Sequence, residues 1–147
     1  MSEKALRAAS ILIVDDDKDF LEIFSTKLKS AGFRVTTAMG GQEGIDTAKA
    51  NKPDLMLLDV EMPNMNGVET LFKIRHDPDL SALKVVFITN YGEPQKETSW
   101  IDEKFAREAG ATDYIKKTED LEAIVNEVNK VLRRYEVFNE EETRLSQ

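Results

Sequence analysis

The sequence contains no cysteine and a single histidine, His76. The absence of cysteine excludes disulfide bonds and metal sites built from thiolates. No apolar run approaches the roughly 20 residues that a membrane-spanning helix needs, and residues 1–10 lack the apolar core of a signal peptide. These absences favour a cytoplasmic protein that has no membrane partner.

The chain also lacks a block of lysine and arginine, and its formal net charge is −8. An acidic domain of this kind is not expected to bind nucleic acid directly. With 147 residues, of which 41% are hydrophobic and 33% charged, the chain has the length and composition of one globular domain. No internal repeat or low-complexity segment divides it.

Short apolar or β-branched runs alternate with amphipathic stretches along the whole chain. Strands are predicted at Ile11–Val14, Arg34–Thr37 (an edge strand), Leu55–Leu58, Lys84–Thr89 and Asp113–Lys116. Helices are predicted at Asp17–Ala31, Gln42–Ala50, Val68–Arg75, Ser99–Ala109 and Leu121–Arg134. Five such alternations predict an α/β fold, a doubly wound five-stranded parallel sheet with right-handed crossovers and helices on both faces.

Polar side chains stand where four of the predicted strands end: Asp15 and Asp16, Asp59, Thr89 and Lys117. The carboxyl ends of parallel strands meet at one edge of a sheet, where ligands of such folds bind. The sequence places Asp59 at the rim of this edge, outside the buried core, because the apolar run ends there.

Carboxylates gathered at one edge repel one another, so either a pKa rises or a cation binds. Donors that are all oxygen suit a hard ion, Mg²⁺ first and Mn²⁺ second. An ammonium and a hydroxyl beside such an ion describe a site for a small, highly charged anion such as a phosphoryl group. One aspartate could then act as a nucleophile and form an aspartyl phosphate.

Several motifs agree in order and spacing with those of one known family. They are Asp15-Asp16 after Ile-Leu-Ile-Val, Leu-Leu-Asp59-Val-Glu-Met-Pro-Asn-Met-Asn-Gly67, Phe-Ile-Thr89, and Gly110-Ala-Thr-Asp-Tyr-Ile-Lys-Lys117. The chain from about Ser10 to Arg134 thereby resembles the receiver domain of two-component response regulators. The resemblance implies the flavodoxin-like strand order 2-1-3-4-5 and a signalling role. The implied chemistry is limited to self-phosphorylation and slow autodephosphorylation.

The resemblance also implies a role for each site residue. Asp59 would accept a phosphoryl group from a sensor histidine kinase or phosphotransfer protein, and the domain would then change its binding to a downstream protein. The implied Mg²⁺ ligands are Asp15, Asp16, Asp59 and the backbone carbonyl of Glu61. The implied phosphoryl-binding and switch residues are Thr89, Tyr114 and Lys117, the last in preference to Lys116.

Three features depart from the family pattern and bear on how phosphorylation is transmitted. Thr118 follows Lys117 where the family usually has proline, often with a cis peptide bond. Asn90 replaces a small residue after Thr89, and the segment from Thr89 to Tyr114 is longer than usual and carries Trp100.

Other interpretations of the same residues remain open at this point. Asp15 to Asp17 could form a plain helix N-terminal cap, and Lys117 a solvated loop lysine. The chain could be a Mg²⁺-dependent phosphatase or phosphotransferase of small molecules, although such enzymes commonly need an aspartate where Glu61 stands. It could also be a degenerate receiver that binds partners without being phosphorylated.

The sequence divides into an extension at 1–9, the domain at 10–134 and a tail at 135–147. An apolar seam with steps of three and four residues crosses into the tail: Leu121, Ile124, Val128, Val131, Tyr135 and Phe138. We expect the last helix to continue to about Phe138 and to pair weakly with a second copy or to lead into an output domain. The alternative is that Val137 and Phe138 fold back onto the domain. The tail is too short for an output domain of its own, so the chain is either a single-domain regulator or a piece of a longer protein.

Overall fold

A computed structural model describes residues 9–89, 103–117 and 120–145, without the side chains of residues 103, 105 and 135–145. In chain order the elements are β1 (Ser10–Val14), α2 (Lys18–Ser30), β2 (Arg34–Ala38), α3 (Gly41–Asn51), β3 (Leu55–Asp59), α4 (Gly67–Arg75), β4 (Val85–Thr89), α5 (Glu103–Glu108), β5 (Asp113–Lys116) and α6 (Leu121–Leu145). The strands form one parallel sheet in the order β2-β1-β3-β4-β5. The predicted fold class, strand order and edge position of β2 are confirmed.

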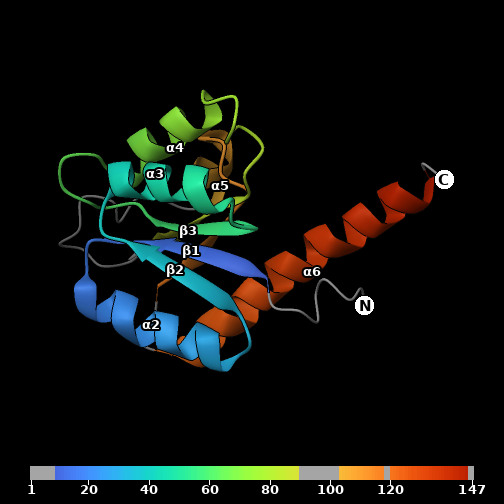
Figure 1. Cartoon of the computed structure of the whole chain (residues 1–147), viewed down its shortest axis with the longest axis horizontal. Helices are drawn as coiled ribbons and strands as arrows, with labels where there is room; N and C mark the ends of the chain where they lie inside the picture. The colour runs from blue at the N-terminus through green and yellow to red at the C-terminus, as the bar shows by residue number, and fades with distance from the viewer. Residues whose placement is uncertain (1–8, 90–102, 118–119, 146–147) are drawn as a thin grey trace.

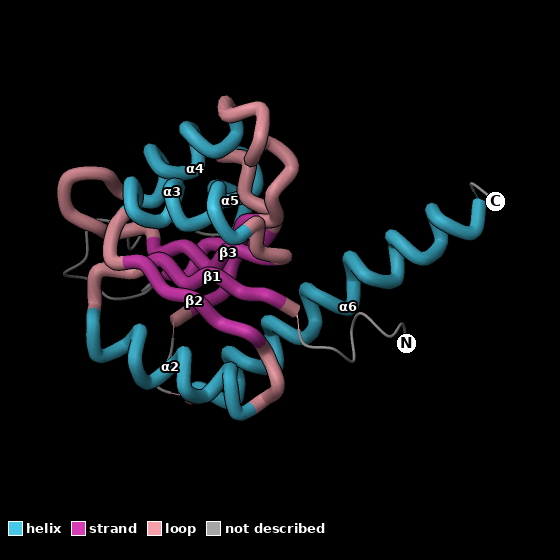
Figure 2. The backbone as a smooth tube through the Cα atoms, viewed as in Figure 1, coloured by secondary structure: helices cyan, strands magenta, loops and turns pink. Residues whose placement is uncertain are grey.

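The sheet lies between two layers of helices, with α3, α4 and α5 on one face and α2 and α6 on the other (Figures 1 and 2). The three inner strands supply apolar side chains to both faces, which explains their continuous apolar runs. The apolar cluster under α3, α4 and α5 includes Leu58 and Phe87, and the cluster under α2 and α6 includes Leu57 and Ile88. Since both faces are covered, the strand ends are left as the open edge of the domain.

Local sequence signals fix several helix ends close to their predicted positions. Asp17 caps α2 by accepting a hydrogen bond from the Phe20 N–H (3.1 Å). Asn66 and Glu69 form a reciprocal capping box at the start of α4. Gly32 follows α2 with φ +101°, a conformation that favours glycine. Helix α5 begins at Glu103, and the first residues of the helix predicted from Ser99 lie outside the described part of the chain.

Helix α6 spans 25 residues and ends at Leu145, beyond the position near Phe138 where the sequence suggested its end. A helix of this length is about 37 Å long. Figure 1 shows its second half running away from the sheet, with no other labelled element beside it. In the part of the chain that the structure describes, α6 included, no helix has the length and apolarity of a transmembrane segment.

Candidate functional site

Asp15, the first residue after β1, is the most deeply buried acidic residue of the site, with 1% of its surface exposed. Its N–H bonds to the carbonyl of Ala38 at the end of β2 (3.1 Å). One carboxylate oxygen accepts the N–H of Asp17 (2.9 Å), and the other accepts Nζ of Lys117 (3.0 Å). The backbone and the carboxylate are therefore both fixed by bonds to other segments.

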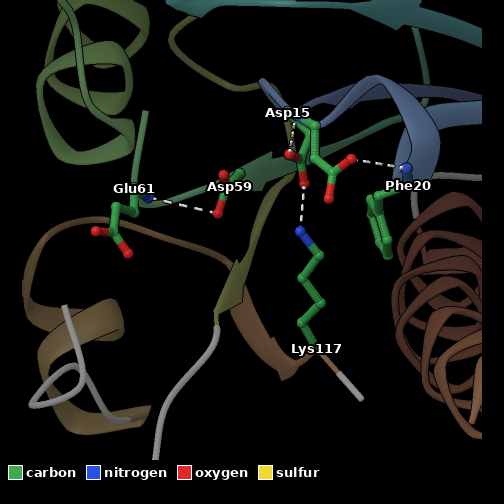
Figure 3. A network of polar contacts seen from close by, with 6 residues as sticks. Asp15, Phe20, Asp59, Glu61 and Lys117 are labelled. Atoms are coloured by element: carbon green, nitrogen blue, oxygen red, sulfur yellow. Dashed lines mark hydrogen bonds and ion pairs between the residues drawn. The ribbon is translucent and has the colours of Figure 1, made fainter. Parts of the chain in front are cut away.

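The run Asp15-Asp16-Asp17 is divided between two tasks. Asp17 caps the helix, as the alternative interpretation of the run as a helix N-terminal cap suggested for all three residues. Its carboxylate points to the α2 backbone. The carboxylates of Asp15 and the exposed Asp16 instead form a cluster with the carboxylate of Asp59. Figure 3 shows the carboxylates of Asp15 and Asp59 at the same edge of the sheet, with the Lys117 ammonium bonded to Asp15.

Asp59 is the last residue of β3 and so lies at the carboxyl edge of the sheet, as expected. It is only 4% exposed, so the expectation that it stays outside the buried core is wrong. The strand lies at the centre of the sheet between β1 and β4, and the following loop folds back over its end. The Gly67 N–H bonds to the carbonyl of Val60 (2.8 Å), and a Cβ on Gly67 would collide with the carbonyl oxygen of Asp59. Glycine at position 67 thus permits the close approach that buries Asp59.

The carboxylates of Asp15, Asp16 and Asp59 each offer an oxygen within 4.8 Å of the others. Burial, followed by the negative charge of Asp15, raises the pKa of Asp59 to about 8, against the opposing effect of Lys117. Burial also raises the pKa of Asp15. A cluster of oxygen donors in which Asp15 and Asp59 are buried and unfavourable to ionise is suited to a hard divalent cation, so the residues fit Mg²⁺.

Lys117 follows β5, and its N–H bonds to the carbonyl of Thr89 (2.6 Å). Its side chain is 13% exposed and forms the ion pair with Asp15, so it is not a solvated loop lysine. Nζ also lies 4.0 Å from the centroid of the Phe20 ring. In the sequence, Phe20 is one apolar position of the helix predicted at Asp17–Ala31, and no local pattern signals its contact with a lysine from the far end of the domain.

Thr89 and Tyr114 lie on the neighbouring strands β4 and β5. Thr89 ends β4 with 1% exposure, one residue beyond Ile88, which pairs with Asp59 in the sheet. Tyr114 pairs with Phe87 and packs, half-buried, against the cluster under α3, α4 and α5. Three sequence features named above, Asn90, Trp100 and the Lys117–Thr118 peptide bond, lie outside the described residues.

A parallel sheet of this order, with three carboxylates and a lysine at its carboxyl edge, defines a receiver-type signalling domain. The family model described as response regulator receiver domain matches residues 11–129, and the chain belongs to this family. Family membership places the chain among signalling domains and disfavours the small-molecule phosphatase interpretation.

Relatives of known name agree with this assignment. Protein PilH of Pseudomonas aeruginosa is 33% identical over 124 residues, which cover 84% of this chain and 98% of PilH. The DNA-binding dual master transcriptional regulator RpaA of Synechocystis is 32% identical over 84% of this chain, which spans only 49% of RpaA. The chain likewise spans 29% of a probable cyclic di-GMP phosphodiesterase of Vibrio cholerae.

Solved structures show the same fold. The chemotaxis protein CheY4 of Vibrio cholerae superposes with a TM-score of 0.71 at 27% identity, covering 84% of this chain and 98% of CheY4. A CheY-like receiver domain protein of Methanospirillum hungatei superposes with a TM-score of 0.73 at 29% identity, covering 88% and 97%.

Proposed function

We propose that Asp59 accepts a phosphoryl group from a phosphorylated histidine of a sensor kinase or phosphotransfer protein. The observation that carries this proposal is the buried Asp59 carboxylate, held within 4.8 Å of two further carboxylates and beside the Lys117–Asp15 ion pair. The family supports a signalling role, in which the phosphorylated domain changes its binding to a downstream protein.

The same carboxylates are proposed to hold Mg²⁺, or Mn²⁺ in its place. The ligands would be Asp15, Asp16, Asp59 and the backbone carbonyl of Glu61. When bound, such an ion neutralises charge on the transferring phosphoryl group. The Glu61 N–H, 3.4 Å from an Asp59 carboxylate oxygen, holds the loop beside that carboxylate.

In the proposed transfer, a carboxylate oxygen of Asp59 forms a bond to phosphorus while the phosphorus–nitrogen bond to the donor histidine breaks. The electron pair of that bond leaves with the imidazole, and no proton needs to leave Asp59 if it is already ionised. Lys117 would exchange its ion pair with Asp15 for one with a phosphoryl oxygen. Slow hydrolysis of the acyl phosphate would end the signal, so the chemistry is self-modification without turnover of a free substrate.

Thr89 and Tyr114 are the proposed switch. The Thr89 hydroxyl, at the end of the strand beside Asp59, would bond a phosphoryl oxygen, and Tyr114 would turn toward the space that Thr89 leaves. The packing of Tyr114 against the apolar cluster under α3, α4 and α5 supports this as the route from the site to a binding surface. A new hydrogen bond would then bias two packings of one face.

The direct test is incubation with acetyl phosphate and Mg²⁺, followed by intact-mass measurement. We expect one phosphoryl adduct, absent in Asp59→Asn and retained in Asp46→Asn, which changes an exposed aspartate of α3. An adduct of undiminished size in Asp59→Asn would disprove the assignment. Steady turnover of p-nitrophenyl phosphate would instead support the small-molecule phosphatase, and absence of any adduct would support the degenerate receiver.

We further propose that α6 pairs weakly with α6 of a second copy. The helix continues to Leu145, and its sequence carries Tyr135 and Phe138 on the seam that buries Val128 and Val131 in the domain. A seam this short predicts association that depends on concentration. Sedimentation should show dimers that Phe138→Glu abolishes and the off-seam variant Val137→Glu retains; equal association of both variants contradicts the pairing.

A further inference from the structure

Phe20 is placed at the site by the helix cap that Asp17 provides. Asp17 donates its N–H to Asp15 and accepts the N–H of Phe20, so the first turn of α2 is tied to the carboxylate that binds Lys117. The Phe20 ring lies against Phe24, with ring centroids 5.3 Å apart, and Phe24 is fully buried. A rigid support of this kind fixes where the outer face of the Phe20 ring lies.

That outer face meets the Lys117 ammonium, whose Nζ stands 4.0 Å from the ring centroid. Figure 3 shows Lys117 with Asp15 at the tip of its side chain and Phe20 on the α2 side. The Lys117 side chain is only 13% exposed, so the negative face of the ring supplies attraction that water would otherwise provide. Lys117 is therefore held by two partners of different kinds.

The two partners differ in how strictly they fix the ammonium. An ion pair with Asp15 ties Nζ to one oxygen, whereas attraction to a ring face tolerates a range of directions within about 6 Å. The ring can consequently keep its hold on Lys117 while Nζ turns away from Asp15. If Asp15 became a ligand of a divalent cation, the contact with the Phe20 ring would still retain the ammonium at the site.

We propose that Phe20 is a positioning residue for Lys117, whose ring holds the ammonium while Lys117 exchanges Asp15 for an oxygen of the phosphoryl group on Asp59. This inference rests on the proposed function of Asp59. It predicts that removal of the ring slows phosphorylation, because Lys117 is no longer held beside Asp59. Removal of the ring should not weaken Mg²⁺ binding, because a less restrained Lys117 competes less well with the cation for the Asp15 carboxylate.

The contact itself can be tested in the metal-free protein, without any phosphorylation. Protons on the Lys117 ammonium and its neighbouring carbon should show upfield ring-current shifts in an NMR spectrum of lysine side chains. Phe20→Leu and Phe20→Met should abolish these shifts, and Phe20→Tyr should keep them. Phe33→Leu is the matched control, because Phe33 packs at the edge of the same apolar cluster.

The functional effect is measured as the rate of adduct formation with acetyl phosphate at saturating Mg²⁺, together with Mg²⁺ affinity. Loss of the ring should slow the reaction about three- to tenfold in Phe20→Leu and Phe20→Met, while Mg²⁺ affinity is unchanged or increased. Phe20→Tyr and Phe33→Leu should react at nearly the wild-type rate. General loosening of the domain would lower the rate and the Mg²⁺ affinity together.

The outcomes separate this inference from the proposed function. Absence of an adduct in the wild-type protein overturns the function of Asp59, while the ring-current shifts still report on the contact. A wild-type adduct combined with wild-type rates in both non-aromatic variants overturns the positioning role alone. Equal slowing in Phe20→Leu and Phe33→Leu also overturns it, because it assigns the effect to packing.

Discussion

Raising the pH from 6 to 8 should strongly increase the affinity of the protein for Mg²⁺. The pKa of Asp59 is raised to about 8 by burial and by the neighbouring Asp15, so the metal-free site holds a proton at neutral pH. A cation binds only the ionised carboxylate and must displace this proton. With binding restricted to the ionised form, the dissociation constant should fall about ninefold from pH 6 to 7 and about fivefold from pH 7 to 8.

Isothermal titration calorimetry measures both parts of this linkage. Titrations at pH 7 in two buffers of different ionisation enthalpy should show close to one proton released for each Mg²⁺ bound. Asp59→Asn should bind Mg²⁺ more weakly and lose the share of the pH dependence that belongs to Asp59. Asp46→Asn, an exposed change on α3, should keep the full dependence. A proton count near zero in the wild-type protein, with an affinity independent of pH, would refute the reasoning.

The same ionisation predicts how stability changes with pH when no metal is present. Because the pKa of Asp59 lies above its ordinary value of 3.8, the folded state keeps a proton that the unfolded state has lost. This contribution to stability is fully present below pH 4 and is lost as the pH rises to about 8. The free energy of unfolding should therefore decrease by an amount on the order of a few kcal/mol over this range, with saturating Mg²⁺ opposing the decrease.

Two further predictions concern the frame around the site. Gly67→Ala should cost about 1–3 kcal/mol of stability and weaken Mg²⁺ binding, because its Cβ would collide with the Asp59 backbone. Chemical denaturation measures the first effect and Mg²⁺ titration the second. Gly40→Ala is the control, because a Cβ there meets nothing within 4 Å. Arg75→Met should cost about 2 kcal/mol, since the guanidinium donates to two backbone carbonyls in the loop between α4 and β4 and to one in the loop between α5 and β5. Lys73→Met on the exposed side of α4 should be nearly neutral in urea unfolding. A Gly67→Ala protein as stable as Gly40→Ala, or an Arg75→Met protein as stable as Lys73→Met, would contradict the respective argument.

The strands were predictable because each carries its own signal. Leu55 to Leu58 read as a strand covered on both faces, and that is how β3 lies in the sheet. The convergence of Asp15 and Asp59 also followed from the sequence, since parallel strands bring their carboxyl ends together. These features depend on local patterns and on one general rule of parallel sheets.

The burial of Asp59 and the contacts of Lys117 required the three-dimensional structure. Exposure at a strand end depends on how the next loop folds, and here Gly67 allows that loop to press on the strand. The Lys117–Asp15 ion pair joins residues 102 positions apart, and the Phe20 ring reaches the same ammonium from a third segment. The sequence placed Lys117 at the same edge of the sheet as Asp15, but no residue pattern encodes the approach of Phe20, which results from the packing of α2 against the sheet.

The site compensates for its buried negative charge by two means, and the proposed reaction would use both. In the metal-free domain, Asp59 keeps a proton and Asp15 pairs with Lys117. Carboxylates that held a divalent cation would need neither compensation, because Asp59 would bind the cation in its ionised form and Asp15 would share its carboxylate between the cation and the ammonium. Cation binding would therefore ionise the proposed nucleophile and release Lys117 for the incoming phosphoryl group in one event. On this proposal, Mg²⁺ would prepare both groups before the transfer begins.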